Sequence, residues 1–129
     1  MSLEMTTSLS YLAWASALCL ILWLPYVLER IMRQGLMTVL QYKDTGAEPA
    51  VWAQRAHRAH LNLVENLAPF AALVLIANVT STKVAGCAAL FFWARVVQAI
   101  VHIAGIAYVR TVAFFVSWLA LIIMFFSVI

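Results

Sequence analysis

The most unusual feature of this sequence is a set of charged and amide side chains inside otherwise apolar segments. In the stretch RAHRAHLNLVENLAPF, residues 55–70, Arg58, Asn62, Glu65 and Pro69 are spaced by four, three and four. Because residues three and four apart share one face of an α-helix, these four would form one polar stripe. Guanidinium and amide groups together can bind a small anion such as a carboxylate. The stripe therefore predicts a wall of an anion-binding pocket.

A second polar stripe follows further along the chain, where Arg95, Gln98 and His102 are spaced by three and four. A single charge at the centre of a membrane helix costs about 2.5–3.5 kcal/mol on insertion scales. We therefore expect Glu65 to pair with Arg95 where the two helices meet. Such a pair could simply hold the helices together or could belong to a pocket. The further donors at the same end, Arg58, Asn62 and Arg110, favour the pocket.

Pro69 lies one turn after Glu65 and has no N–H to give to the Glu65 carbonyl. We expect a kink there, and both an incidental and a functional kink are compatible with the sequence. His57 and His60 are spaced by three with no suitable carboxylate nearby, so no metal site is predicted and the histidines are interpreted as interfacial anchors. The two cysteines, Cys19 and Cys87, are interpreted as apolar fillers.

The elements that would position these groups are transmembrane helices. Of the 129 residues, 66% are hydrophobic and only 10% are charged, so the solvent for most of the chain must be lipid. Four apolar runs of about the length needed to cross a bilayer are separated by one long connection, 29–54, and two short links. The runs are 9–28, 59–79, 84–107 and 111–129. The fold class predicted is an all-α integral membrane protein, a single up-and-down bundle of four transmembrane helices.

Two features refine the ends of these runs. No Lys or Arg precedes the first run, so we expect a membrane span there rather than a signal peptide. Pro49 after Glu48 is typical of a helix start, so the second helix should begin before its apolar run. It would then have about thirty residues and a length of about 45 Å.

The basic residues predict the orientation of the bundle. The long connection and the third link carry nearly all of them outside the spans, and only Lys83 lies on the other side. By the positive-inside rule the long connection faces the cytoplasm and both termini face away from it. The basic residues are Arg30, Arg33, Lys43, Arg55, Arg58 and Arg110. The formal net charge of +3 comes mostly from them, and no basic stripe with interleaved aromatics predicts nucleic-acid binding.

The segment RAHLNLVENLAPF, 58–70, resembles the second-helix signature of the MAPEG family, the membrane-associated proteins in eicosanoid and glutathione metabolism. The resemblance extends to ARVVQAIVH in the third helix and VRTVAF, 109–114, in the fourth, and covers essentially the whole chain. The short form of the chain resembles a bacterial branch of the family. The resemblance implies a homotrimer in the bacterial inner membrane, with the second helices at the centre and glutathione bound between neighbouring protomers near the cytoplasmic face.

The resemblance also implies roles for individual residues. Arg58, Asn62 and Glu65 match the second-helix contacts of glutathione, and Arg95 matches the third-helix arginine that faces the glutamate. Arg110 matches the fourth-helix arginine that activates the thiol in catalytic members. Arg30 is a weaker match to a first-helix arginine. Apart from the resemblance, two residues near Arg110 are candidates for cofactor binding by their chemistry: Thr111 as a hydrogen-bond donor and His102 as a proton acceptor.

Three departures from the family pattern bear on function. Leu61 stands where several catalytic members have arginine, His102 replaces a tyrosine, and Gln98 replaces a histidine found in some members. The favoured function is a glutathione-dependent transferase or peroxidase acting on lipophilic electrophiles, with Arg110 as the catalytic residue. The alternative is a non-catalytic protein of the same fold that binds a lipid or a protein partner. A pump or channel is disfavoured because no inverted repeat is present.

Overall fold

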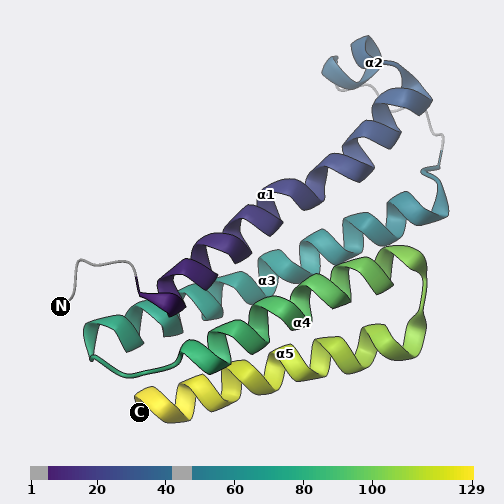
Figure 1. Ribbon diagram of the computed structural model, residues 1–129. Coiled ribbons are helices and arrows are strands. Elements are labelled where there is room, and N and C mark those ends of the chain that lie inside the picture. The colour runs from purple at the N-terminus through teal and green to yellow at the C-terminus, as the bar shows by residue number, and fades with distance from the viewer. Residues whose placement is uncertain (1–5, 42–47) are drawn as a thin grey trace.

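The structure is a computed structural model and describes residues 6–41 and 48–129. Four long helices are joined in the order α1 (Thr7–Gln34), α3 (Val51–Val79), α4 (Ala85–Ala104) and α5 (Ala107–Val128), and a short α2 (Leu36–Leu40) follows α1. Successive long helices run in opposite directions (Figure 1). All four are long and apolar enough to cross a membrane. The predicted up-and-down bundle of four transmembrane helices is confirmed.

The bundle has two distinct ends. We call one the basic end, where α1 and α4 finish and α3 and α5 begin, because Arg30, Arg33, Arg55, Arg58 and Arg110 lie there. We call the other the terminal end, where α1 begins and α5 finishes. Figure 1 shows α1 diverging from α4 and α5 toward the basic end. Lys43, which the sequence also assigned to the basic side, lies outside the described residues.

The first helix is defined by its caps. The Thr6 hydroxyl accepts a hydrogen bond from the Leu9 amide at 3.2 Å, which satisfies one of the free N–H groups at the start of α1. The helix continues beyond the predicted run ending at residue 28 and stops at Gly35, whose φ of 91° breaks the helical path. The short α2 was not predicted, because the sequence shows no cap or apolar period long enough to mark five residues.

Helix α3 begins at Val51, directly after Pro49 and Ala50, and has 29 residues. The predicted helix start near Pro49 and the length of about thirty residues are confirmed. The helix is continuous through Pro69.

A tight corner joins α4 to α5 and sets where Arg110 lies. Gly105 has a φ of 83°, which ends α4 at Ala104, and α5 begins two residues later. The end of α4 and the start of α5 therefore differ from the predicted runs, 84–107 and 111–129, because this single left-handed residue reverses the chain. The Arg55 Nε donates to the Ile103 carbonyl at 2.9 Å. A Cβ on Gly105 would lie 3.1 Å from the Arg55 guanidinium carbon, so α3 packs directly on the corner.

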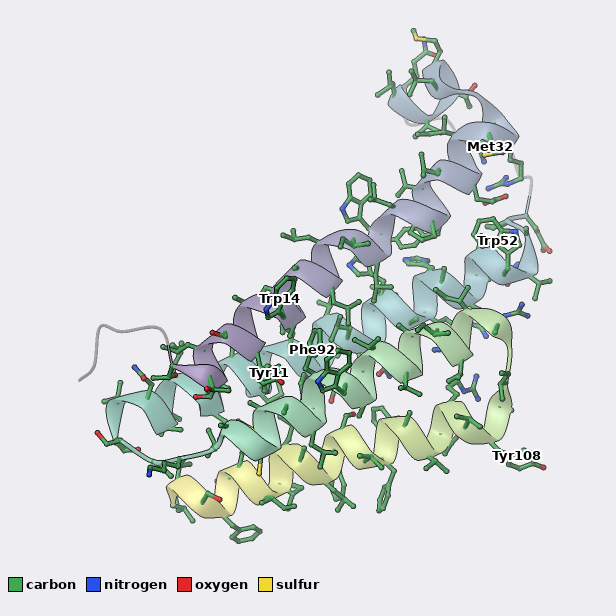
Figure 2. All side chains as sticks on the ribbon, viewed as in Figure 1. Tyr11, Trp14, Met32, Trp52, Phe92 and Tyr108 are labelled. Atoms are coloured by element: carbon green, nitrogen blue, oxygen red, sulfur yellow. The ribbon has the colours of Figure 1, made fainter. Side chains whose placement is uncertain are left out.

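The best-packed part of the core lies in the terminal half. Phe70 of α3 stacks on Phe91 of α4 with ring centroids 4.1 Å apart, and both rings are fully buried. Alanines complete this cluster and let the helix backbones approach closely, as small residues do between membrane helices. Tyr11 and Phe92 pack between α1 and α4 (Figure 2).

Apolar and aromatic side chains cover the outside of the bundle. Trp14, Met32 and Trp52 are exposed, and Tyr108 points away from the bundle at the start of α5 (Figure 2). In water such a surface would drive aggregation, whereas in a bilayer it is the expected lipid-facing surface. The chain is therefore an integral membrane protein.

Candidate functional site

Arg95 is the most deeply placed charged side chain among the described residues. It is 1% exposed and lies nine residues before the end of α4, about 14 Å along the helix at 1.5 Å per residue. Its Nη2 donates to the Asn62 amide oxygen, and its Nη1 donates to the Ser117 hydroxyl at 3.3 Å. The guanidinium also faces the Phe114 ring, 5.7 Å from its centroid. One guanidinium thus ties α3, α4 and α5 together.

The predicted ion pair between Glu65 and Arg95 is wrong for the single chain. Glu65 is exposed, and the Arg95 guanidinium binds Asn62 instead. Asn62 lies one turn closer to the basic end on the same side of α3, where its amide oxygen meets the guanidinium. Helical spacing left open which member of the stripe meets Arg95, and the structure places Arg58, Asn62 and Glu65 in different surroundings.

Four of the predicted residues lie around one hollow at the basic end, which we call the α3–α5 hollow. It has a volume of about 250 Å³ and receives Asn62 from α3, His102 from α4, and Arg110 and Thr111 from the start of α5. Gln98 and Phe114 complete its lining. Because α5 starts at Ala107, Arg110 falls in its first turn and its guanidinium reaches the hollow from the corner fixed by Arg55.

His102 is oriented within this hollow by Gln98. The Gln98 amide Nε2 donates to His102 Nδ1 at 3.2 Å, and both side chains are buried. A neutral imidazole that accepts at Nδ1 carries its hydrogen on Nε2. The free edge of His102 is then a hydrogen-bond donor, which does not favour the proton-acceptor role implied at the sequence level.

The Thr111 hydroxyl hydrogen also has a partner within the protein. Its hydroxyl donates to the Ala107 carbonyl at 3.2 Å, one turn back in α5. A hydroxyl has a single hydrogen, so in this conformation Thr111 offers a ligand an acceptor and no donor. Arg110 and His102 are therefore the donors at this hollow, together with the amide of Asn62.

Two further predicted residues lie elsewhere. Arg30 and Arg58 line a second hollow of about 620 Å³ between the end of α1 and the start of α3, which we call the α1–α3 hollow. None of the described residues lines both hollows. The structure of one chain therefore divides the predicted glutathione contacts into two groups.

The sequence analysis missed Glu29, which is buried in α1 with 8% exposure and lines the α1–α3 hollow. Its Oε1 accepts from Arg33 Nε at 2.9 Å and from the Ala50 amide at 3.3 Å, so it links the end of α1 to the start of α3. The spacing of Glu29 and Arg33 by four residues was a signal for the first contact. Ser117, the second partner of Arg95, had no signal beyond being a hydroxyl in an apolar run.

Of the remaining sequence features, His60 has a structural role. His60 Nδ1 lies 2.8 Å from the Tyr26 hydroxyl and its Nε2 lies 3.7 Å from Cys19 Sγ, so this histidine connects α3 to α1. Leu61, a departure from the family pattern, is exposed and lines neither hollow. Across residues 6–41 and 48–129, no group of three His, Cys, Asp or Glu side chains could hold a metal ion.

The fold and the polar end define a class: an integral membrane bundle of four helices with arginines gathered around hollows at one end. The model of the MAPEG family matches residues 11–129, almost the whole chain. The chain belongs to the MAPEG family, as the second-helix stripe suggested. No curated protein and no solved structure matches it.

Proposed function

We propose that this protein is a glutathione-dependent membrane enzyme, a transferase or peroxidase, that acts on lipophilic electrophiles. Family membership supports this class, because the family includes such enzymes as well as non-catalytic members. The observation that carries the proposal is the convergence of Asn62, His102, Arg110 and Thr111 on one hollow at the basic end. These residues come from three helices and far-apart positions in the sequence.

The chemistry requires a thiolate close to a cation. A thiol loses its proton more readily beside a guanidinium, as cysteine thiols do beside cationic groups. Arg110 supplies that cation in the proposal, and the electrophile enters from the surrounding lipid through the apolar surface of the bundle. The thiolate sulfur then bonds to the electrophilic carbon or oxygen, and the leaving group departs with the bonding electrons.

The proposal includes a homotrimer. The α3–α5 hollow is smaller than the roughly 300–1,000 Å³ of most small-molecule sites. Arg30 and Arg58 lie in the other hollow of the same chain, so a neighbouring protomer would have to bring them to the bound tripeptide. Glu65 is exposed on α3 and is available for that interface. In this arrangement helices α3 pack at the centre.

The proposed orientation places the basic end in the cytoplasm and both termini on the opposite side of a bacterial inner membrane. The supporting observation is the position of Arg30, Arg33, Arg55, Arg58 and Arg110 at one end, with Lys83 at the other. Glutathione, which is polar, would then reach the site from the cytoplasm.

The test is a calorimetric titration of the purified protein in detergent with millimolar glutathione, followed by a conjugation assay with a chlorodinitrobenzene acceptor. We expect binding and turnover in the unsubstituted protein. In Arg110→Ala turnover should fall at least a hundredfold while binding is largely kept, and Lys83→Ala at the terminal end is the matched control. Absence of binding would refute the proposal, and unchanged turnover in Arg110→Ala would refute the role of Arg110.

One observation favours a second candidate, a non-catalytic family member that binds a lipid or a protein. His102 Nδ1 lies 3.2 Å from Gln98 Nε2, so this ring nitrogen is occupied and does not serve as the proton acceptor for the thiol. Binding of glutathione without turnover would favour this candidate.

A further inference from the structure

The α1–α3 hollow contains Arg30 and Arg58, which the proposed function uses to bind glutathione, together with polar groups to which it gives no role. Three arginines, Arg30, Arg33 and Arg58, line it together with Glu29 and Gln34. The remaining lining residues are Tyr26, Pro49, Ala53, Gln54 and His57. Arg33 is paired with Glu29, so among the described lining residues Arg30 and Arg58 give the hollow its positive balance, which favours an anionic group.

Glu29 makes the hollow more selective than a simple anion site. Its Oε1 accepts two hydrogen bonds, whereas its Oε2 is buried and accepts none from the described residues. The amide oxygen of Gln34, which lines the same hollow, is also buried with no donor among the described residues. Buried acceptors are almost always paired in folded proteins, by protein groups, water or a ligand, so these two oxygens are acceptors that a bound group with N–H donors could use.

These two observations restrict the ligand. A simple anion would satisfy the arginines but would be repelled by Glu29, and a simple cation would meet the reverse problem. A group that carries a primary ammonium next to a negatively charged oxygen satisfies both. Its ammonium can donate to Glu29 and Gln34 while its anionic oxygens accept from Arg30 and Arg58.

The position of the hollow fits such a zwitterion. Helix α1 has 28 residues, about 42 Å at 1.5 Å per residue, which exceeds the roughly 30 Å of a bilayer's hydrocarbon core. The hollow lies at the last turns of α1 and the first turns of α3 and is therefore at the level of the lipid headgroups. Both water-soluble and lipid-borne zwitterions reach this level.

We propose that the α1–α3 hollow recognises a primary ammonium paired with an anionic group, with Glu29 Oε2 accepting from the ammonium. Two sources carry this chemistry. One is the amino-acid end of glutathione, in which case the inference rests on the proposed function. The other is the headgroup of an ethanolamine phospholipid, which does not depend on that function.

The first arm of the test compares glutathione with glutathione acetylated on its amino group, by calorimetry on the detergent-purified protein. If glutathione is the source, acetylation should weaken binding at least tenfold, because it removes the ammonium charge. In Glu29→Gln the two ligands should bind within about twofold of each other. Glu48→Gln, which removes the same charge from an exposed residue outside the hollow, should behave like the unsubstituted protein.

The second arm compares a short-chain ethanolamine phospholipid with the choline phospholipid of the same chains, whose trimethylated nitrogen has no N–H. If the lipid is the source, the ethanolamine form should bind at least tenfold more tightly, and Glu29→Gln should remove that preference. Native mass spectrometry of the detergent-solubilised protein counts the bound lipid.

The outcomes separate the two proposals. A preference for the free amine in either arm, lost in Glu29→Gln, supports the inference. No preference in either arm overturns it, and so does a preference that Glu29→Gln leaves unchanged. If glutathione binds equally well with and without acetylation, the proposed function stands and glutathione is not the source of the ammonium. If glutathione does not bind at all, the proposed function fails and the phospholipid comparison alone tests the inference.

Because Glu29 also holds Arg33 and the start of α3, a second variant is needed if Glu29→Gln does not fold. Gln34→Leu removes the other orphan acceptor and should lower the amine preference about threefold. An unchanged preference in a folded Gln34→Leu protein would then overturn the inference.

Discussion

The two ends of the bundle differ in what fills the space between the helices. At the terminal end, Phe70, Val74, Phe91, Ala120 and Met124 are buried in one apolar cluster. At the basic end the buried apolar cluster reduces to Leu22, Leu63 and Ala99, and arginines line the hollows there. Two hollows at the terminal end are lined mostly by hydroxyl, aromatic and small side chains. Lys83 is the cation among their described lining residues, which include no arginine.

This difference indicates that the terminal half of the bundle provides most of the stability and that the basic half provides the space for binding. Dispersion contacts in the terminal half hold four helices together without directional bonds. The basic half holds them through a few hydrogen bonds, such as those of Arg55, Arg95 and Glu29, that leave room between the helices. Substitutions at the two ends should therefore have separable effects.

The largest expected effect on stability comes from the terminal core. Phe70→Ala removes a fully buried ring stacked on Phe91 and should lower the free energy of unfolding by about 3–5 kcal/mol. Thermal unfolding in detergent measures this loss. Glutathione affinity, measured well below the melting temperature, should not change, and a parallel loss of affinity would show that the two ends are not separable.

A smaller effect is expected where the basic half meets the core. Asn62→Leu removes the acceptor of Arg95 Nη2 and leaves a buried charged donor unsatisfied, which should cost about 1–3 kcal/mol. Asn66→Leu is the matched control, because the Asn66 amide donates only to the Asn62 carbonyl within its own helix at 2.8 Å. Equal melting temperatures for the two variants would contradict the role given to the contact between Asn62 and Arg95.

The smallest effects are expected from two glycines in and after α4. Gly105→Ala should destabilise by about 1–2 kcal/mol, because its φ of 83° is strained for alanine and the new Cβ meets Arg55. Gly86→Ala, in the first turn of α4 with nothing within 4 Å of the new Cβ, should stabilise by roughly 0.5 kcal/mol. Urea or thermal unfolding compares them, and the same sign for both would contradict the account of the corner.

The sequence predicted the helices well because a bilayer imposes length and composition on each span. It predicted one polar stripe with Arg58 and Asn62 on it, whereas these two residues line different hollows. It did not predict that Asn62 rather than Glu65 meets Arg95, because the relative depth of two helices depends on their packing. The left-handed turn at Gly105 shortened α4, and the glycine itself was a usual signal of a helix end that the apolar run hid.

The candidate site was predicted in part for the same reason. Asn62, His102, Arg110 and Thr111 do meet around one hollow. Their separation from Arg30 and Arg58 depends on the divergence of α1, which is a property of the packed bundle and not of any one helix. Glu29 was overlooked because it stands at the end of an apolar run, where a carboxylate looks like an ordinary boundary residue.

The central claim is that the basic end binds glutathione and that Arg110 stabilises its thiolate. The ultraviolet absorbance of the thiolate, recorded at neutral pH while glutathione is titrated into the purified protein, measures this directly. The account predicts a thiolate band that grows to saturation in the unsubstituted protein and in Lys83→Ala, and that is lost in Arg110→Ala. Saturable binding of glutathione with no thiolate band, or an undiminished band in Arg110→Ala, would contradict it.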